Sequence, residues 1–221
     1  MSTTDPGVRR TRTDMRNLLI EAALIEFGCK GFDGASTRAI ARRADAHQPQ
    51  INYHFDSKEA LWEAAVDHLF DLLNAALLPP ALELHGPERL AASPDDVLGE
   101  RFADRVRRFV RFAADHPELN RIIVHEATAE TDRLRWMVDR HVRPLFEETQ
   151  EAWTRLQTTG IAAPIDASSA HYMMVGAASL PFVNAPEVRL LAGIEPTDSA
   201  WVESHAEGLI AMLLPGRRSS S

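Results

Sequence analysis

The sequence predicts an all-α protein, with a helix-turn-helix domain of three helices at the N-terminus and a larger helical domain after it. Ala, Leu, Arg and Glu recur at the three- and four-residue spacing of amphipathic helices. No clear run of alternating β-branched residues is present, so strands are not expected. With 221 residues and 45% hydrophobic content, the chain has ample material for one large or two small cores.

Composition and charge limit the compartment and the partners. Cys29 is the only cysteine, which excludes an internal disulfide and favours a reducing cytoplasm. The N-terminus lacks the apolar stretch of a signal peptide, and no apolar run approaches the roughly 18 residues that span a membrane. The net charge is −8, yet residues 1–58 contain 9 Lys+Arg against 7 Asp+Glu, a local charge of +2 that leaves −10 for the remainder. The N-terminal region can therefore contribute a local basic face for nucleic acid, although small charge asymmetries between two halves of a chain are also common in other proteins.

Three helices are expected in the first 57 residues. The first has an apolar stripe at helical spacing, formed by Met15, Leu18, Leu19, Ala22, Ile25 and Cys29. Ser36 is the expected N-cap of the second helix. The third is short, from Pro49 to about residue 55, with Ile51 and Phe55 facing inward. Asp56 is expected to cap a long helix that follows and runs to about residue 78.

Polar side chains remain on the outside of this unit once Ile51 and Phe55 are turned inward. Gln and Asn suit base edges in the major groove, whereas Tyr, His and Lys suit phosphates. The amide groups that open the second helix can also face a phosphate. The candidate DNA contacts are therefore Thr37, Arg38, His47, Gln48, Gln50, Asn52, Tyr53, His54 and Lys58. From these residues alone, an ordinary polar helical hairpin remains an alternative.

A sequence motif carries a family resemblance. Residues 36–62, STRAIARRADAHQPQINYHFDSKEALW, resemble the DNA-binding signature of the tetracycline-repressor (TetR) family. The matching positions are Thr37, Ile40, Ala41, Ala44, Ile51, His54, Phe55, Lys58, Glu59 and Leu61. The resemblance covers roughly residues 13–62 and implies a homodimeric transcriptional regulator, most often a repressor, that binds a palindromic double-stranded DNA operator and is released by a small molecule.

The sequence departs from the family signature at three positions. Asp45 stands where the family usually has a turn glycine, although Asp tolerates the left-handed conformation better than most residues. Pro49 stands at the opening of the recognition helix, where it offers no N–H to a phosphate. Asn52 replaces a frequent tyrosine.

Further helices are expected after a proline-rich connection at 79–94. They lie within 96–117, where His116 and Pro117 end the helix, and within 117–130, 131–160 with a kink at Pro144, 166–185 and 197–214. A loop with Pro186, Gly193 and Pro196 precedes the last one. The expected domains are 1–57 for DNA binding, ordered from about residue 12, and 58–217 for ligand binding and dimerisation. Residues 218–221 are expected to be a disordered tail.

The segment 172–183, YMMVGAASLPFV, contains no charged residue. A helix that is apolar all round must be buried on every side. One side is expected to pack within the subunit and another on a second copy, since the resemblance implies a dimer interface built from the last two helices. A buried helix in a monomer is the alternative.

Ligand-binding candidates are the inward-facing aromatic, methionine and polar residues of the central helices. They are Phe109, Phe112, Ile122, His125, Glu126, Trp136, Met137, His141, Tyr172 and Met173. The same residues also suit a plain core. No cofactor, metal ligand or catalytic residue is expected, because Ala129 stands where a His-Glu-x-x-His motif needs its second histidine and no Gly-rich phosphate loop occurs. A ligand-independent DNA-binding regulator and a helical enzyme are the alternative functions.

Overall fold

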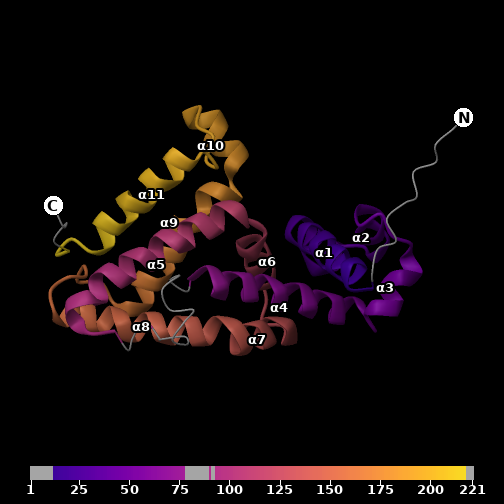
Figure 1. Cartoon of the computed structure of the whole chain (residues 1–221), viewed down its shortest axis with the longest axis horizontal. Coiled ribbons are helices and arrows are strands. Elements are labelled where there is room, and N and C mark those ends of the chain that lie inside the picture. Colours follow the sequence, from indigo (N-terminus) through magenta and orange to yellow (C-terminus); the bar gives the residue numbers. More distant parts are fainter. Residues whose placement is uncertain (1–11, 78–89, 91–92, 218–221) are drawn as a thin grey trace, which may run out of the picture. The chain divides into compact units, whose positions relative to one another are not determined.

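Residues 12–77, 90 and 93–217 are described by the computed structural model, and none of them forms a strand. They are helices joined by turns (Figure 1), so the all-α prediction is confirmed. The chain divides into two compact units, Met1–His68 and Leu69–Ser221, with the boundary inside one helix, α4 (Lys58–Leu77). The predicted tail at 218–221 and most of the proline-rich connection lie outside the described residues.

The first unit contains α1 (Arg12–Gly34), α2 (Thr37–Arg43), α3 (Gln48–His54) and the beginning of α4. The Ser36 side chain accepts a hydrogen bond from the Ala39 N–H at 3.4 Å, which confirms Ser36 as the N-cap of α2. Asp45, in the turn between α2 and α3, has a φ of 51°, the left-handed conformation that the family glycine would adopt. This tight turn brings α2 and α3 together as a helix-turn-helix.

The buried face of α1 differs from the predicted stripe. Leu19, Ala23 and Phe27 are buried, whereas Ile25 and Cys29 are exposed. Apolar residues occupy so much of the circumference of α1 that periodicity permits more than one orientation. Packing against α2 selects the orientation, which the stripe alone could not do.

The cap of α4 also differs from the prediction. The Ser57 Oγ accepts a hydrogen bond from the Ala60 N–H at 3.0 Å, so Ser57 and not Asp56 caps this helix. The reason is the helix start: α4 begins at Lys58, and the preceding side chain is the one that reaches the free N–H groups of the first turn.

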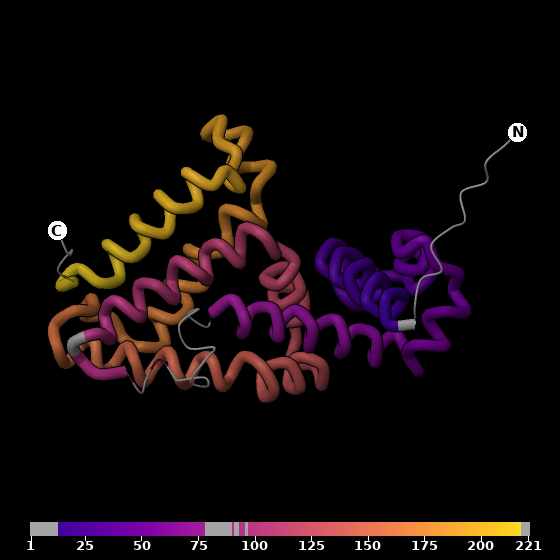
Figure 2. The backbone as a smooth tube through the Cα atoms, in the orientation of Figure 1, coloured from indigo at the N-terminus to yellow at the C-terminus, as the bar shows by residue number. Residues whose placement is uncertain are grey.

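The second unit contains the end of α4 and the remaining helices. They are α5 (Asp95–Asp115), α6 (Glu118–Glu126), α7 (Asp132–Met137), a π-helical turn (Val138–Val142), α8 (Arg143–Thr158), α9 (Ala167–Val183), α10 (Ala185–Ala192) and α11 (Ser199–Leu213). Figure 2 traces the chain from α9 through the short α10 into α11.

One predicted segment of this unit agrees with the structure and another is wrong. The expected long helix over 131–160 is present as a continuous helical run from Asp132 to Thr158, formed by α7, the π-helical turn and α8. The π-helical turn lies directly before Arg143 and Pro144, where the kink was expected, because proline has no N–H for the regular helical hydrogen bond. The expected loop before the last helix contains α10, which starts with Pro186 in its first turn and ends at Gly193 with a φ of 66°. There proline begins a helix in a segment that was predicted to be a loop.

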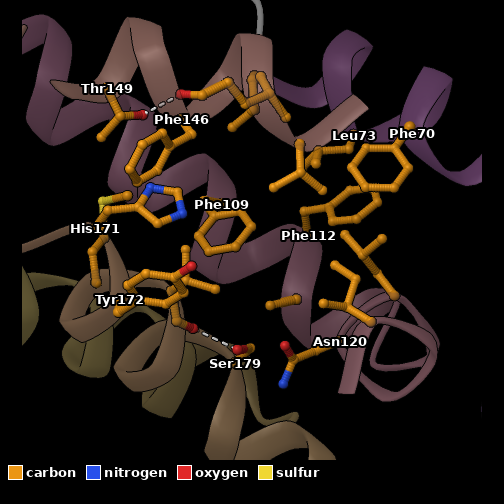
Figure 3. A pocket seen from close by; sticks show the side chains of 18 of the residues that line it. Phe70, Leu73, Phe109, Phe112, Asn120, Phe146, Thr149, His171, Tyr172 and Ser179 are labelled. Atoms are coloured by element: carbon orange, nitrogen blue, oxygen red, sulfur yellow. Dashed lines mark hydrogen bonds between the residues drawn. The ribbon is translucent and has the colours of Figure 1, made fainter. Parts of the chain in front are cut away.

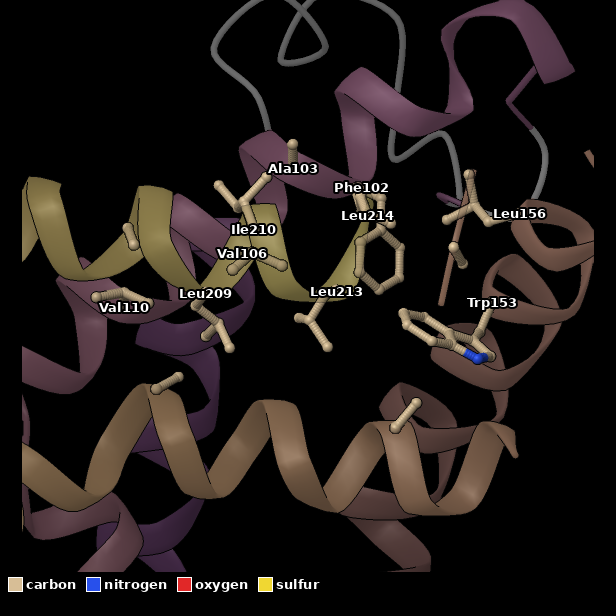
Figure 4. Close-up of a cluster of buried hydrophobic side chains, with 14 of the residues drawn as sticks. Phe102, Ala103, Val106, Val110, Trp153, Leu156, Leu209, Ile210, Leu213 and Leu214 are labelled. Carbon is tan, nitrogen blue, oxygen red and sulfur yellow. The ribbon is translucent and has the colours of Figure 1, made fainter. Parts of the chain in front are cut away.

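Four helices of the second unit share one hydrophobic core. Buried side chains of α5, α8, α9 and α11 pack together, with Phe102, Trp153 and Leu213 among them (Figure 4). The rings of Phe102 and Trp153 lie 5.8 Å apart, and the Trp153 indole N–H donates to the Ile165 carbonyl at 2.9 Å. The core therefore holds α9 in one orientation. The residues of α9 that lie outside the core face either the solvent or another part of this unit.

Helix α9 is not buried on every side in the single chain, which contradicts the alternative of a fully buried helix in a monomer. Ala178, Ser179 and Phe182 are buried, but Tyr172 and Leu180 are exposed, the latter by 55%. The subunit's own helices cover only part of the helix circumference, because α5, α6, α8, α10 and α11 pack on limited portions of it. None of the described helices is both long and apolar enough to span a bilayer.

Candidate DNA-binding surface and ligand cavity

The short helix α3 is anchored by two buried side chains. Ile51 and Phe55 are almost fully buried, and the Arg16 guanidinium lies over the Phe55 ring at 5.3 Å from its centroid. Asn52 and Tyr53 are exposed, Tyr53 by 65%. The helix therefore uses one face to hold its position and leaves the amide and phenol groups for solvent or a partner.

The nine predicted DNA contacts differ in how far they are available. Five are exposed: Arg38, His47, Gln48, Asn52 and Tyr53. The other four are half-buried: Thr37, Gln50, His54 and Lys58. All nine lie on α2, on α3, or at the start of α3 or α4, so the surface comes from one continuous stretch of chain.

Two of the half-buried residues have internal contacts. The Gln50 Oε1 accepts a hydrogen bond from the His47 backbone N–H at 2.8 Å, so this side chain holds the start of α3. The Lys58 Nζ lies 4.6 Å from the centroid of the Phe32 ring. The Gln50 side chain is held at the start of α3 by this bond and keeps its NH₂ group and one oxygen lone pair for a base, whereas the Asn52 side chain is exposed.

The candidate DNA-binding surface carries more positive charge than the nine predicted contact residues supply. Arg42 and Arg43 are exposed in the last turn of α2, although neither was among the predicted contacts. The signal for them was present in the sequence, as the Arg-Arg pair next to the motif positions Ala41 and Ala44. Their guanidinium groups increase the positive charge that an approaching phosphate would meet.

The second unit contains a cavity of about 490 Å³ among its helices (Figure 3). Its walls come from the end of α4, from α5, α6, α7, the π-helical turn, α8 and α9. The wall is mainly apolar and rich in aromatic rings, with Phe70, Phe109, Phe112, Phe146 and Tyr172. A volume in the range of roughly 300–1,000 Å³ with an apolar wall and a few polar groups is typical of small-molecule sites.

Four of the ten predicted ligand residues line this cavity: Phe109, Phe112, Met137 and Tyr172. The other six lie outside its wall: Ile122, His125, Glu126, Trp136, His141 and Met173. For two of them the neighbour in the sequence lines it instead, Ile123 for Ile122 and Met174 for Met173. An error of one residue turns a helical side chain by about 100°, which is enough to move it from the cavity to the core or to the surface.

The remaining outliers have other contacts. His125 is exposed, and the buried Glu126 carboxylate pairs with the Arg133 guanidinium at 3.2 Å. The His141 ring stacks on Phe70 with centroids 4.5 Å apart, and Trp136 packs edge-on against His141 at 5.5 Å. His141 and Trp136 therefore stand behind a wall residue of the cavity.

Sequence reasoning missed the most distinctive polar group of the cavity, His171 on α9. Its Nδ1 is buried without a hydrogen-bond partner in the described part of the chain, and its ring meets Phe146 edge-on at 4.8 Å. Burial lowers the pKa of His171, because an apolar environment disfavours the charged imidazolium. The available signal was a polar residue at the start of an otherwise apolar segment, one turn before Val175 and two before Ser179, which also line the cavity.

A helix-turn-helix unit followed by an all-α unit with an apolar cavity is the architecture of a transcriptional regulator. Sequence models of two families match the chain: bacterial regulatory proteins of the tetR family at residues 19–65, and the tetracyclin repressor-like C-terminal domain at residues 100–213. The second match covers more than half of the chain. The chain therefore belongs to the TetR family of bacterial transcriptional regulators, which are DNA-binding regulators and not enzymes, and the resemblance found at 36–62 is confirmed.

Individual relatives are distant. The chain is 34% identical over 64 residues to the biofilm operon icaADBC HTH-type negative transcriptional regulator IcaR of Staphylococcus aureus, a match that spans 29% of this chain and only 34% of IcaR. It is 23% identical over 203 residues to the HTH-type transcriptional regulator RutR of Escherichia coli K12, covering 92% of this chain and 90% of RutR. The crystal structure of AibR in complex with isovaleryl coenzyme A and operator DNA superimposes with a TM-score of 0.68 at 17% identity, over 91% of this chain and 98% of AibR.

Proposed function

We propose that this TetR-family regulator is a cytoplasmic repressor that binds a palindromic operator as a homodimer and leaves it when a small, largely apolar molecule occupies the cavity. In this proposal residues 1–57 bind DNA and residues 58–217 bind the ligand and dimerise. The observation that carries the proposal is the cavity of about 490 Å³ with aromatic walls in the unit that follows the helix-turn-helix. The negative regulator IcaR and the AibR complex with both a ligand and operator DNA support it as relatives.

The DNA-binding part of the proposal assigns α3 to the major groove. Asn52 and Gln48 are exposed amides, which suit base edges, and Tyr53, Arg38 and Lys58 suit phosphates. The half-buried Thr37 and His54 are assigned to the phosphate backbone at the ends of α2 and α3. His47 and Gln50 lie at the start of α3 and are joined by a hydrogen bond. In this proposal their main role is to orient α3 on the DNA.

The dimer part of the proposal rests on exposed apolar side chains of α9, α10 and α11. Leu180, Leu190 and Met212 are exposed by 55%, 88% and 75% in the single chain. Large apolar residues exposed on consecutive helices are more typical of a protein–protein interface than of a solvent-facing surface. A two-fold dimer presents two α3 helices to successive major grooves, about 34–36 Å apart, and so predicts a palindromic site.

The dimer is tested by Leu180→Glu. The side chain is exposed in the single chain, so the variant should fold normally but lose the dimer, because an unpaired charge buried at an interface costs several kcal/mol, about 3–5. Light scattering at micromolar concentration should report a dimer for the unmodified protein and a monomer for the variant. A monomeric unmodified protein would contradict the proposal, and with it the palindrome.

Release by a ligand requires a difference in affinity between two conformations. Helix α4 contains Lys58 near its start and the cavity residues Phe70 and Leu73 further on, so a ligand that moves this wall acts on a helix that also carries a candidate DNA contact. To change the DNA-competent population from 99:1 to 1:99, the ligand must prefer the other conformation by about 5.5 kcal/mol. Operator DNA must then weaken ligand binding by the same factor.

The experiment selects bound DNA from a random pool and then titrates apolar compounds against the selected complex. We expect an imperfect palindrome and at least one compound that both raises the melting temperature of the protein and releases the DNA. Tyr172→Ala, in the cavity wall, should weaken that compound about tenfold, whereas His125→Ala, exposed outside the wall, should not. Compounds that stabilise the protein but never release DNA would favour a ligand-independent regulator instead.

A further inference from the structure

The charged groups in the cavity wall already have partners of opposite charge. The Arg105 guanidinium lies 2.8 Å from a Glu148 carboxylate oxygen, and the Arg143 guanidinium lies 2.6 Å from that of Asp139. The His116 Nδ1, which is charged only when protonated, lies 3.1 Å from the Glu118 carboxylate. An anionic ligand near either arginine or near His116 would therefore also meet a carboxylate, so its charge would gain little and lose its hydration.

The Arg105 pair is also held from its acidic side. Glu148 accepts a hydrogen bond from the Leu90 backbone N–H at 2.6 Å, and its side chain is more buried than that of Arg105. Moving Glu148 away to free Arg105 for a ligand would break this bond and leave a buried carboxylate without its cation. Arg105 is therefore a compensated part of the wall rather than a free anion receptor.

Neutral hydrogen-bonding groups remain available at two places in the wall. The first is His171, whose ring lies between Phe146 and Phe109 in Figure 3 and whose buried Nδ1 has no partner among the described residues. Because burial lowers its pKa, the imidazole is uncharged at neutral pH and has one N–H donor and one nitrogen acceptor. A group of this kind without a partner destabilises the empty protein and is satisfied by a ligand that reaches it.

The second place is Asn120 on α6. Figure 3 shows its carboxamide near Ser179, away from His171, with Phe109 and Tyr172 in the part of the wall between the two places. The Asn120 carboxamide makes no hydrogen bond with other described residues, so it has both a donor and an acceptor to offer. The Ser179 hydroxyl donates to the Val175 carbonyl and keeps acceptor capacity.

We propose that the ligand is an uncharged, mainly aromatic molecule with a hydroxyl, carbonyl or amide group at each end, one bound by His171 and the other by Asn120. The proposal deepens the proposed function, on which it rests for the use of the cavity. The aromatic body packs against Phe109, Phe112 and Tyr172, and carboxylates or phosphates are excluded. This chain then differs in ligand class from AibR, whose ligand in the crystal carries the phosphates of coenzyme A.

The test compares three rigid probes with the full-length protein by isothermal titration calorimetry: biphenyl, para,para′-dihydroxybiphenyl and para,para′-biphenyldicarboxylate. The dihydroxy probe should bind about tenfold more tightly than biphenyl, because two neutral hydrogen bonds in an apolar site contribute at least this much. The dicarboxylate should bind more weakly than biphenyl. Because the three probes share one carbon skeleton, their affinities measure the effect of hydrogen-bonding groups separately from the effect of negative charge.

Two variants on different helices assign the preference to residues. His171→Phe keeps the ring but removes both nitrogens, and Asn120→Leu keeps the size but removes the amide. Each should reduce the affinity of the dihydroxy probe relative to biphenyl several-fold, whereas His125→Phe, outside the wall, should leave this ratio unchanged. His171→Phe should also raise the melting temperature of the empty protein, which would not occur if His171 had a purely structural role.

The outcomes separate this proposal from the proposed function. Equal or tighter binding of the dicarboxylate, a hydroxyl preference that survives both variants, or no binding of either neutral probe would overturn the ligand class. The operator complex is then titrated with the dihydroxy probe. A probe that binds through His171 and Asn120 without releasing DNA supports the ligand class and contradicts the proposed function. Release of DNA by the dicarboxylate supports control by a ligand and contradicts the ligand class.

Discussion

Helices α3 and α9 both combine apolar and polar residues, but they use the polar ones in opposite ways. In α3 (Gln48–His54), Ile51 is buried and the polar Asn52 faces solvent, so its amide remains hydrated when the unit folds. In α9 (Ala167–Val183), the polar His171 faces inward, and its Nδ1 lacks a partner. A polar residue outside a core makes little difference to stability and can be read from a motif. One inside a core destabilises the empty protein, and its role depends on what else lines the same space.

The first way to test this comparison is to remove the largest fully buried side chain described in the second unit, that of Trp153. Trp153→Ala should reduce the free energy of unfolding by about 3–5 kcal/mol, because it leaves a void and also removes the hydrogen bond from the indole to the Ile165 carbonyl. Denaturant titration followed by circular dichroism measures this change. Tyr53→Ala on α3 is the control, and as an exposed substitution it should change stability by no more than about 0.5 kcal/mol.

The second test separates reading of DNA from support of the helix within α3. Asn52→Ala should reduce discrimination between operator variants by about 1–3 kcal/mol without changing stability, if its amide reads a base. Gln50→Ala should instead lower stability, by roughly 0.5–2 kcal/mol, because the His47 N–H loses its acceptor. Binding to a panel of single-base operator variants, measured together with thermal melts, distinguishes the two. Unchanged discrimination in Asn52→Ala would remove this residue from the base-reading set.

The third test concerns phosphate contact at the start of α4. Lys58→Met should weaken all DNA sequences alike and lower the slope of log affinity against log salt by about one unit. The Lys58 Nζ lies near the Phe32 ring, from which its flexible stem can extend to a phosphate. Lys30→Met is the control. The Lys30 amine pairs with Glu26 at 2.7 Å, so its removal should leave the slope unchanged. An unaltered slope for Lys58→Met would show that the contact with Phe32 is its main role.

The smallest expected effect is a difference in the pH at which a titratable group of each unit begins to lower the stability of the protein. A hydrogen bond from Lys30 lowers the pKa of Glu26 in the first unit, and burial lowers the pKa of His171 in the second. For both groups the unfolded chain binds the proton first as pH falls, so stability is lost below the unfolded pKa, about 6.5 for His and 4.3 for Glu. Relative to His171→Phe, the unmodified protein should lose stability as pH falls below about 6.5, and relative to Glu26→Gln it should lose stability only below about 4.3. Urea titrations from pH 7 to pH 3 measure both, and parallel curves would contradict the assignments.

The sequence predicted the helix-turn-helix at the level of single residues. Ser36 as a cap, Asp45 in the left-handed turn, and Ile51 and Phe55 as anchors are all present in the structure. These features depend on neighbours within a few positions of the chain, through backbone sterics and local hydrogen bonds. Helix ends were less well predicted, as Ser57 at α4 and Pro186 in α10 illustrate, since proline and polar residues can either start or stop a helix.

The apolar, aromatic character of the cavity was predicted, but only some of the residues that line it were. Aromatic and methionine residues of the central helices were expected around a ligand, and Phe109, Phe112, Met137 and Tyr172 line the cavity. The sequence did not determine how each helix is rotated about its own axis. Apolar residues on neighbouring positions, such as Ile122 with Ile123, satisfy the same periodicity in either orientation.

The sequence by itself determined that the chain is all-α, that a TetR-type helix-turn-helix lies in its first quarter, and which face of α3 is turned inward, because these follow from contacts between residues close in the chain. Only the tertiary structure decided that His171 and Asn120, 51 positions apart, face one cavity and that the charges around it are paired. That placement depends on the packing of helices distant in sequence. Many combinations of helix rotation bury similar apolar area, and only the complete set of contacts selects one of them.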